Sequence, residues 1–371
     1  MIPAEDSIGM RVAVLASGGV DSSVALATLA QAGHDVHAFY LKVWLEDELE
    51  HLGECPWEED LRYARAVAGQ FGVPLTVIPL QRAYREGVVA YLLEELERGG
   101  TPSPDLFCNS RIKFGAFADW VDAEFPGGRF ERVATGHYAR RVEKAGGVEL
   151  HRAPDPVKDQ TYFLSRVSGR QLERSSFPVG DLRKTEVRRL AARLGLAPQD
   201  RRDSQGICFL GGVRYRDFVT AQLGDRPGPV VDEATGDEIG THRGHWRFTI
   251  GQRRGLGLSG GPWFVSGKDP AANRVMVRRG AGRPTFRFPV ADLHWIGRDP
   301  PPGAERLLVR VRHGPELAPA RVSWDGAGGG DVRLDEPDEG IAPGQFAVLY
   351  RGTRCLGAGR IRTATIGNPR L

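Results

Sequence analysis

The segment Ser17–Ser23, which reads Ser-Gly-Gly-Val-Asp-Ser-Ser, constrains the fold of this chain more than any other stretch. A short apolar run, Arg11–Ala16, precedes it, and a helix-forming run, Val24–Ala32, follows it and ends at Gly33. The segment is therefore predicted to be the turn between a buried strand and a helix. Its glycines let a ligand approach the backbone, and its hydroxyl groups and the helical N–H groups favour a phosphate. A turn of small residues without a ligand is the alternative.

The turn contains no lysine, and no Gly-Lys-Ser or Gly-Lys-Thr follows it, which distinguishes it from the Walker phosphate loop. Asp21 lies within it, and an acid beside phosphates is typical of a residue that holds Mg²⁺ or orients a hydroxyl group. Strand and helix patterns then alternate, with strands predicted over 35–41, 74–79 and 130–135 and helices over 58–71 and 84–98. This alternation predicts a doubly wound parallel sheet, with ligands at the carboxyl ends of its strands.

A stiff loop is predicted from residue 101, where two prolines stand close together, and helical periodicity resumes at Ile112. Cys108 is therefore expected at or just before a helix N-terminus, with Arg111 and Lys113 nearby. The helix dipole and these cations favour the thiolate, which makes Cys108 a candidate reactive cysteine. A small buried hydrophobic residue is the alternative. Asp105, in the same loop, could move a proton for the thiol or a substrate.

Polar residues also follow the later strands of the first half. His137 comes directly after a predicted strand, where it would contact a nucleotide or be capped by the neighbouring loop. Residues 183–202 carry many arginines and lysines and few acids, and this clustering favours a polyanion although a solvated helix face is the usual alternative. Cys208 lies in a polar, glycine-containing turn. Because it is far from Cys108 along the chain, only the fold could bring the two cysteines together.

From about residue 211 short alternating runs separated by glycine turns replace the helical periodicity, which predicts small β-barrels. The expected domains are 1–205 for the nucleotide-binding unit, 206–275 for a small central unit and 276–371 for a C-terminal β-barrel.

Two apparent motifs, Gly255–Gly260 (GxGxxG) and Gly257–Gly261 (GxSxG), are rejected. Pro262 follows them, and no helix can open there as either mechanism requires.

Composition narrows the class of protein. The chain has 371 residues and a net charge of +3, so a nucleic acid would need a local basic face. Its four cysteines form no CxxC pair, which argues against a zinc knuckle and a secreted disulfide framework. No apolar run approaches the length of a membrane span, and the first residues match no signal or transit peptide. A cytoplasmic protein with no membrane association is expected.

The phosphate-binding turn resembles that of the ATP pyrophosphatases, which adenylate a carbonyl-type oxygen and release pyrophosphate. Seven blocks together resemble one family in this group, the tRNA-specific 2-thiouridylases of the MnmA type. The blocks are Ser17–Ser23, Pro104–Phe114, Ala134–Tyr138, Lys158–Leu164, Ser176–Gly180, Asp203–Phe209 and Phe248–Gly257. They span almost the whole chain in the order of the family.

The resemblance implies roles for individual residues. ATP, with Mg²⁺, would bind at Ala16, Ser17, Gly18, Gly19, Val20, Asp21, Ser22, Ser23, Leu41 and Gly136. Cys108 matches the nucleophile, Cys208 the cysteine that carries a persulfide, and Asp105 the residue at the target base. Contacts with tRNA are implied for Ser103, Pro104, Asp105, His137, Lys158, Asp159, Gln160, Arg312, His313 and Gln345. The chain departs from the family in having Leu41 where methionine is frequent and Ser103 where asparagine is usual.

The implied reaction is the ATP-dependent 2-thiolation of the wobble uridine in tRNA, with lysine, glutamate and glutamine tRNAs as the expected acceptors. AMP and pyrophosphate would be released, and a sulfur-relay protein or cysteine desulfurase would supply the sulfur. Three alternatives stay open. They are a lysidine synthetase, which needs no cysteine pair, an amide-nitrogen ligase such as GMP synthetase, for which no glutamine-hydrolysing domain is visible, and a non-catalytic RNA-binding protein.

Overall fold

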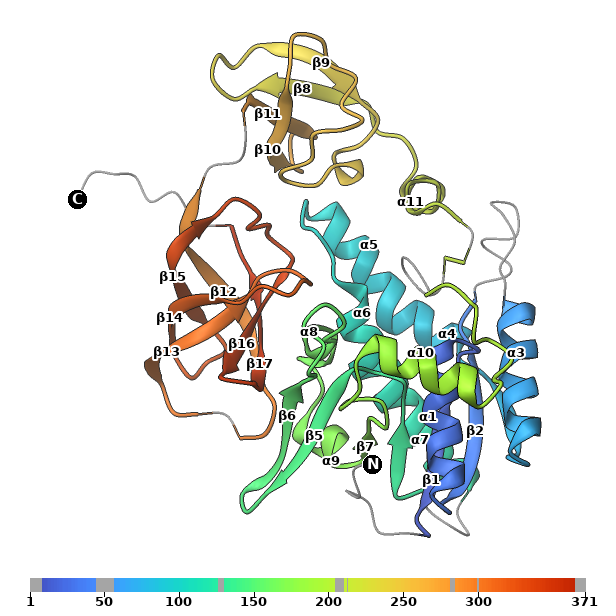
Figure 1. The fold of residues 1–371 in the computed structure, drawn as a ribbon. Coiled ribbons are helices and arrows are strands. Elements are labelled where there is room, and N and C mark those ends of the chain that lie inside the picture. The colour runs from blue at the N-terminus through green and yellow to red at the C-terminus, as the bar shows by residue number, and fades with distance from the viewer. Residues whose placement is uncertain are drawn as a thin grey trace.

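The chain folds into three units that follow one another in sequence (Figure 1). The structure is a computed structural model and describes residues 9–44, 57–125, 130–203, 210–211, 213–280, 284–298 and 300–363. The first unit contains a five-stranded sheet in the order β3-β2-β1-β4-β7, in which every neighbouring pair is parallel. Its strands are β1 (Arg11–Leu15), β2 (Asp35–Lys42), β3 (Leu75–Pro79), β4 (Arg132–Ala134) and β7 (Ser175–Ser176).

Side chains of β1 alternate between the two faces of this sheet. Val12 and Val14 belong to one core cluster, whereas Ala13 and Leu15 belong to another. The first cluster is covered by α1 (Val20–Gln31), α3 (Trp57–Gln70) and α10 (Lys184–Arg193). The second is covered by α4 (Gln81–Tyr84), η2 (Arg85–Val89), α5 (Ala90–Glu97) and α7 (Phe117–Glu124). Helices therefore pack on both faces, and the predicted doubly wound parallel sheet is confirmed.

The helix that carries Cys108 begins earlier than the sequence pattern suggested. Helical structure runs without a break through α6 (Pro104–Phe107), the π-helical η3 (Cys108–Ala116) and α7. Ser103 is the N-cap and Pro104 occupies the first turn, where a missing N–H group and a fixed φ are tolerated. The expectation that Cys108 lies at or before the helix N-terminus is therefore wrong, because it lies one turn inside.

The C-terminal unit is a closed antiparallel β-barrel, as predicted. Strands β12 to β17 pair in the order β12-β15-β14-β13-β16-β17, and a further pairing of β12 with β17 closes the barrel. The strands are β12 (Thr285–Trp295), β13 (Gly303–Arg310), β14 (Ala318–Trp324), β15 (Gly330–Asp338), β16 (Phe346–Arg351) and β17 (Arg354–Ile361). Strand β17 also pairs with a hairpin of the first unit, β5 (Ala139–Lys144) and β6 (Gly147–Arg152), so the two units share one sheet.

The small central unit lies beyond the end of α5 (Figure 1). It has a four-stranded sheet in the order β10-β11-β8-β9 around a core of Val230, Val265, Val275 and Val277. Its elements are α11 (Tyr215–Leu223), β8 (Gly228–Asp232), β9 (Glu238–His242), η4 (His245–Arg247), β10 (Trp263–Asp269) and β11 (Arg274–Arg279). Two further short helices, α8 (Thr161–Leu164) and α9 (Gly169–Glu173), belong to the first unit.

The C-terminal end of α5 joins all three units. From the central unit, His245 Nε2 lies 3.0 Å from the carbonyl oxygen of Glu97 and Lys268 Nζ donates to that of Gly100 at 3.3 Å. From the barrel, Arg360 pairs with Glu95 at 2.9 Å.

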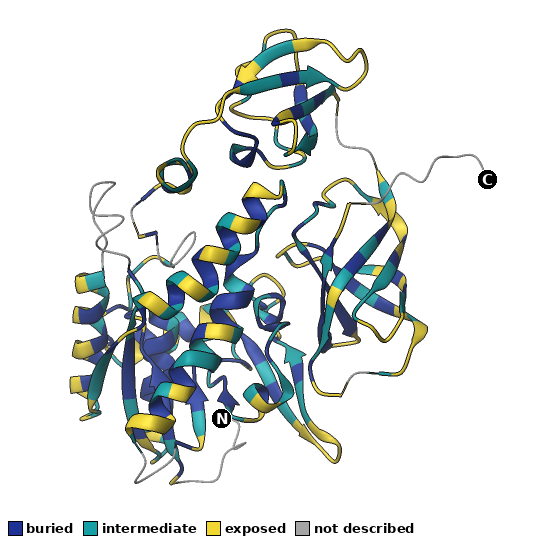
Figure 2. Cartoon of the chain, turned by 180° about the vertical axis from the view of Figure 1, so that it is seen from behind, coloured by how far each residue is buried: buried dark blue, intermediate teal, exposed yellow. Residues whose placement is uncertain are grey.

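In the first unit, buried residues face the interior and exposed residues lie on the outer side of α3 (Figure 2). Within the described ranges no helix is long and apolar enough to cross a membrane.

Candidate active site

The predicted phosphate-binding turn joins β1 to α1 and is folded tightly upon itself. The backbone N–H of Ser17 donates to Ser22 Oγ at 3.2 Å, and that hydroxyl donates to the carbonyl oxygen of Gly19 at 3.0 Å. Gly18 has a φ of +75°, and a side chain there would meet the backbone oxygen of Asp60 at 2.1 Å. A Cβ atom on Gly136 would lie 2.6 Å from the Ser22 nitrogen. Both glycines are therefore required by close backbone approach.

The other residues predicted to bind ATP surround this turn. Ala16, Val20, Ser22 and Ser23 are buried and fix its position, whereas Gly19 and Asp21 are partly exposed. Leu41 is the second-last residue of β2, and Gly136 lies two residues after β4. Both strands pair with β1 in parallel, so both residues lie at the same edge of the sheet as the turn. The described side chains provide no cap for the N-terminus of α1. Its first N–H groups therefore suit an anion.

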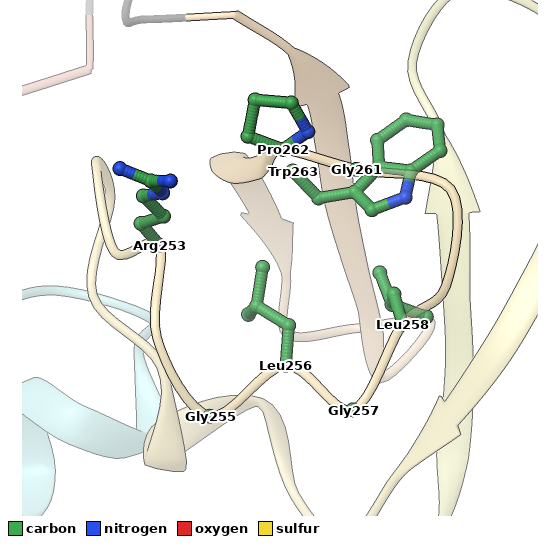
Figure 3. Close-up of a pocket in the computed structure, with 8 residues that line it drawn as sticks. All are labelled: Arg253, Gly255, Leu256, Gly257, Leu258, Gly261, Pro262 and Trp263. Carbon is green, nitrogen blue, oxygen red and sulfur yellow. The ribbon is translucent and has the colours of Figure 1, made fainter.

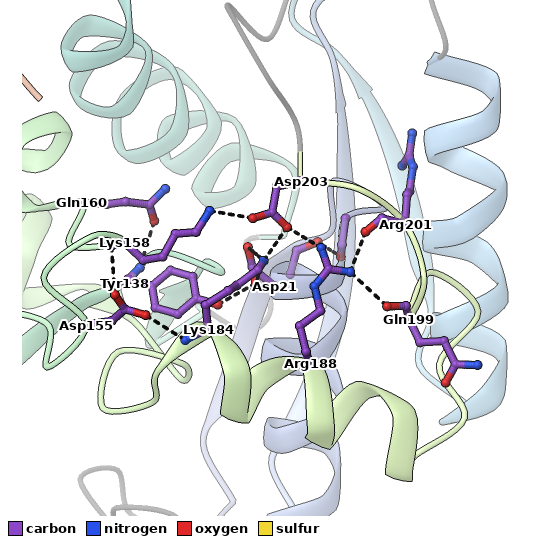
Figure 4. A network of polar contacts seen from close by, with 12 residues as sticks. Asp21, Tyr138, Asp155, Lys158, Gln160, Lys184, Arg188, Gln199, Arg201 and Asp203 are labelled. Carbon is purple, nitrogen blue, oxygen red and sulfur yellow. Dashed lines mark hydrogen bonds and ion pairs between the residues drawn. The ribbon is translucent and has the colours of Figure 1, made fainter. Parts of the chain in front are cut away.

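Asp21 is the centre of a polar network beside the turn (Figure 4). Its carboxylate accepts a hydrogen bond from Tyr138 Oη at 2.7 Å, and Lys184 Nζ lies 2.7 Å from Oδ1 and 2.9 Å from Oδ2. Burial, followed by the charge of Asp21, raises the pKa of Tyr138 and keeps its hydroxyl protonated. Lys184 begins α10 and belongs to the basic stretch 183–202, but it is not among the residues that the sequence predicts to bind ATP. It places an ammonium group where this type of turn has no lysine of its own.

Asp203 collects three cations at the other side of Lys184 (Figure 4). Lys184 Nζ lies 2.8 Å from its Oδ1, Lys158 Nζ lies 2.6 Å from its Oδ2, and Arg188 Nη2 lies 2.5 Å from Oδ1. Burial alone would raise the pKa of Asp203, but the hydrogen bonds from Lys158 and Lys184 lower it below the ordinary value. Arg201 donates to the carbonyl oxygen of Gly18 at 3.2 Å. Part of the basic stretch 183–202 thus converges on the phosphate-binding turn.

A second group of residues lies around the helix that carries Cys108. Asp105 stands one helical turn before Cys108, so the two share a face, and Cys108 is 5% exposed. Burial raises the pKa of Asp105 and the charge of Lys113 opposes this shift. Burial and the same lysine hold the pKa of His137 well below its ordinary value, so the ring is neutral. His137 Nδ1 lies 2.7 Å from the Thr135 hydroxyl oxygen.

The loop before this helix is held by the barrel. Gln345 Nε2 donates to the backbone oxygens of Thr101 at 3.1 Å and Pro102 at 3.3 Å. The N–H of Ser103 donates to Tyr91 Oη at 3.3 Å, and Pro104 is buried. The amide of Gln345, which was predicted to contact tRNA, therefore fixes the loop that leads to Asp105.

The predicted Lys158-Asp159-Gln160 contact patch has a different arrangement for each residue. Lys158 has a side chain 36% exposed and faces Asp203. Asp159 has a side chain with no exposed surface and binds Arg152 Nε at 3.0 Å and Arg310 Nη1 at 2.9 Å. Gln160 Oε1 accepts the Tyr138 N–H at 2.9 Å. The Asp159 carboxylate is thus unavailable for the predicted RNA contact, because it joins the first unit to the barrel.

The two remaining predicted RNA contacts lie on the barrel where it meets the first unit. Arg312 has a side chain 52% exposed and pairs with Asp338 at 2.7 Å. His313 stacks on Phe163 with ring centroids 4.5 Å apart, and burial lowers its pKa. Cys208 lies outside the described residues, and Asp203 is the last described residue before it.

Three family models match consecutive parts of the chain. They are described as the tRNA methyl transferase HUP domain over residues 10–212, the tRNA methyl transferase PRC-barrel domain over 216–279 and the aminomethyltransferase β-barrel domain over 286–361.

The chain is also similar to curated proteins over nearly its full length. It is 42% identical to tRNA-specific 2-thiouridylase MnmA 1 of Bacteroides thetaiotaomicron over 360 residues, covering 95% of this chain and 99% of that protein. The MnmA proteins of Parabacteroides distasonis and Porphyromonas gingivalis are each 42% identical, again over 95% of this chain and 99% of the relative. Among solved structures, an NMN synthetase from Francisella tularensis aligns with 59% of this chain and 79% of its own, at 16% identity and a TM-score of 0.33.

Proposed function

The chain belongs to the tRNA-specific 2-thiouridylase family, and we propose that it replaces the C2 oxygen of the wobble uridine in tRNA with sulfur at the expense of ATP. The observation that carries this proposal is the cluster of cations beside the glycine turn, next to a helix that presents an acid and a cysteine on one face. Such a turn suits a triphosphate. It therefore favours adenylation over the methyl transfer that the family description mentions.

ATP is proposed to bind with its phosphates on the Ser17–Ser23 turn and the N-terminus of α1. Lys184 Nζ lies 2.7 Å from Asp21 Oδ1 beside the turn, and its ammonium group is placed to meet a phosphate of ATP. Lys158 and Arg188, both held on Asp203, extend the positive charge. Adenine and ribose are assigned to the edge near Leu41 and Gly136.

Mg²⁺ is proposed to accompany ATP. Asp21 and Asp203 both contact Lys184 Nζ, so their carboxylates lie close together. This donor set fits, because Mg²⁺ sites with nucleotides use one or two carboxylates plus phosphate oxygens. The described residues contain no cluster of three or more His, Cys, Asp or Glu side chains that could hold a metal by themselves. When bound, the ion would neutralise charge on the departing pyrophosphate.

In the first proposed step the uridine leaves the base stack and enters the site around Asp105, as chemistry on a base requires. Its C2 oxygen attacks the α-phosphorus of ATP, a P–O bond to uridine forms, and pyrophosphate leaves. Asp105 takes the proton from N3 of the uracil, and its raised pKa suits such a transfer. The pyrophosphate charge develops beside Lys184.

In the second step sulfur replaces the activated oxygen. The terminal sulfur of a Cys208 persulfide attacks C2 of the uridine, and AMP leaves with the former C2 oxygen. The Cys108 thiolate then attacks the Cys208 sulfur, which breaks the persulfide bond and leaves the sulfur on C2. The product disulfide between Cys108 and Cys208 is reduced by a thiol before the next cycle. Attack by hydrosulfide released from the persulfide is the variant of this step.

The proposed partners follow from this chemistry. A tRNA would lie against the junction of the first unit and the barrel, where Ser103, Lys158, Arg312 and His313 gather. Lysine, glutamate and glutamine tRNAs are the proposed acceptors, and a sulfur-relay protein or cysteine desulfurase is the proposed source of the persulfide. The predicted cytoplasmic location belongs to the same proposal, because it follows from the tRNA substrate.

The test supplies unmodified glutamate tRNA, ATP, Mg²⁺ and a persulfide-generating desulfurase, and weighs the wobble nucleoside by mass spectrometry. We expect the mass gain of an oxygen-to-sulfur exchange with the wild type. Cys108→Ala and Cys208→Ala should lose it. Cys355→Ala is the matched control, since Cys355 is 1% exposed in the barrel and burial raises its pKa.

AMP formation without sulfur incorporation by the wild type would refute thiolation. Retained incorporation in the Cys108→Ala and Cys208→Ala variants would refute the roles of the two cysteines.

A further inference from the structure

A short segment between α5 and α6 is held by side chains from outside the first unit. We call residues 99–103 the lead segment, because it runs from the end of α5 into the helix that carries Asp105. Its carbonyl oxygens at positions 100, 101 and 102 all accept hydrogen bonds from the other two units. Lys268 Nζ of the central unit donates to the first at 3.3 Å, and Gln345 Nε2 of the barrel donates to the second at 3.1 Å and to the third at 3.3 Å. The place of the lead segment therefore depends on both other units.

Close packing leaves the lead segment little room to shift. A Cβ atom on Gly99 would lie 2.7 Å from Pro270 of the central unit. A Cβ atom on Gly344 of the barrel would lie 2.6 Å from the backbone nitrogen of Thr101, which donates to the carbonyl oxygen of Pro343 at 2.8 Å. The backbone of the segment thus touches both other units directly, and a side chain at either glycine would force them to move.

The charges beside the lead segment also come from all three units. Glu95 of α5 is 6% exposed, and Arg360 of the barrel pairs with it at 2.9 Å and with Asp292 at 2.6 Å. Burial lowers the pKa of Lys268 to about 8, and the charge of Glu95 opposes this shift. The ammonium group of Lys268 is therefore enclosed at the junction and still charged at neutral pH.

Lys268 reaches the junction from a rigid strand. Strand β10 begins at Trp263, which lines a hollow of about 480 Å³ in the central unit (Figure 3), and Lys268 is its second-last residue. Trp263 and Val265 of this strand belong to the core of that unit. Lys268 Nζ also donates to the carbonyl oxygen of Phe248, another core residue, at 2.9 Å. The ammonium group is thus fixed on the central unit while it holds Gly100.

The lead segment transmits this contact to the helix that follows it. The chain continues as Thr101-Pro102-Ser103-Pro104, and each proline fixes its own φ and restricts the residue before it. Ser103 is the N-cap of α6, and Asp105 is the second residue of that helix. A shift at Gly100 would therefore move Asp105, because the stiff chain between them cannot absorb it.

We propose that Lys268 is a positioning residue for the reaction, which sets the place of Asp105 through the carbonyl oxygen of Gly100. This inference rests on the proposed function for the role of Asp105 at the uridine. The ATP-binding turn, Ser17–Ser23, takes part in none of the contacts named above. Loss of the Lys268 ammonium group should therefore slow the chemistry on the uridine without weakening the binding of ATP.

The test compares Lys268→Met with the wild type in tRNA-dependent release of pyrophosphate at saturating tRNA. We expect kcat to fall on the order of 10- to 100-fold, because displacement of a catalytic group by about 1 Å can cost that much rate. The KM for ATP should change less than about twofold. Lys268→Arg keeps a cationic donor and should be the less impaired of the two variants. Lys144→Met, at an exposed position of β5, is the control for loss of a lysine and should match the wild type.

A second readout does not depend on the reaction. Hydrogen–deuterium exchange of the protein without ATP or tRNA should rise in the Lys268→Met variant at the amides of residues 99–107, because the contact that holds Gly100 is gone. Exchange should keep its wild-type rate in β1 of the first unit and in β8 and β11 of the central unit.

An unchanged kcat would overturn the inference, and so would unchanged exchange at residues 99–107. A rise in the KM for ATP as large as the fall in kcat would also overturn it. A rise of exchange over the whole central unit would do the same, because Lys268 would then only hold that unit together. If the wild type releases no pyrophosphate, the proposed function fails, and the exchange comparison still decides whether Lys268 fixes the lead segment.

Discussion

Removing the Asp159 carboxylate is expected to destabilise the junction between the first unit and the barrel. This side chain has no exposed surface, and it is the ionic partner of Arg310, whose own side chain is 1% exposed. The Asp159 carboxylate also accepts hydrogen bonds from Arg152 and from the Thr161 hydroxyl group, the latter at 2.9 Å. Asp159→Ala would leave Arg310 buried and without its counter-charge. The variant tests whether Asp159 acts within the protein or at an RNA surface.

The magnitude follows from the burial of the pair. Breaking a buried ion pair by removing one partner costs about 3–5 kcal/mol. Two further donors of the Arg310 guanidinium, Nε and Nη2, already have no partner among the described residues, so no other group can replace Asp159 without movement. With a urea dependence of about 2 kcal/mol per M, the unfolding midpoint should fall by about 2 M.

Urea unfolding followed by circular dichroism measures this change, and a D159A/R310M variant closes a double-mutant cycle. The double variant should be more stable than Asp159→Ala, because the unpaired charge is gone. A loss below about 1 kcal/mol for Asp159→Ala, or a double variant that is the less stable of the two, would refute a buried ionic junction.

Three further changes test the candidate active site. Lys184→Met should raise the KM for ATP at least about tenfold and slow AMP formation on the order of 100-fold, since it removes the proposed phosphate ligand. Arg189→Met, a change at an exposed position of the same helix, should alter neither quantity. Gly136→Ala should abolish ATP binding in isothermal titration, because its Cβ would lie 2.6 Å from a backbone nitrogen of the phosphate-binding turn, whereas Gly146→Ala, with nothing within 4 Å, should bind normally. Asp105 must be ionised to act as a base. Burial raises its pKa above the ordinary value of 3.8, so the wild-type rate should fall as the pH drops through this raised pKa. Asp105→Asn should be slow at every pH and lack this limb; a rate profile identical to that of the wild type would contradict the role.

Local patterns predicted those parts of the fold that depend on neighbours in sequence. The apolar run Arg11–Ala16, and the succession of strands and helices after it, are enough to predict the parallel sheet. Helix-start signals are present at Ser103-Pro104-Asp105, an N-cap residue followed by proline and an acid, whereas the apolar periodicity on which the predicted helix rests begins only at Ile112. The π-helical turns of η3 distort the ordinary helical period there, which explains the late start.

Contacts between distant segments could not be predicted in the same way. The closure of the barrel by β12 and β17 and the pairing of β6 with β17 join residues far apart in sequence. Lys184 reaches Asp21 only because α10 packs on the same face of the sheet as α1. The resemblance implies RNA contacts for all three residues of the Lys158-Asp159-Gln160 block. Its middle residue proved to be buried because Arg310 approaches it from the barrel.

The central claim is that the C2 oxygen of the uridine is adenylated and then displaced by sulfur. An anticodon stem-loop whose wobble uridine carries a heavy-oxygen label at C2 tests this directly, with the released AMP weighed after one turnover. The account predicts that the label appears in AMP. Unlabelled AMP formed together with thiolated product would contradict it, because the oxygen in AMP would then have come from water or from the protein.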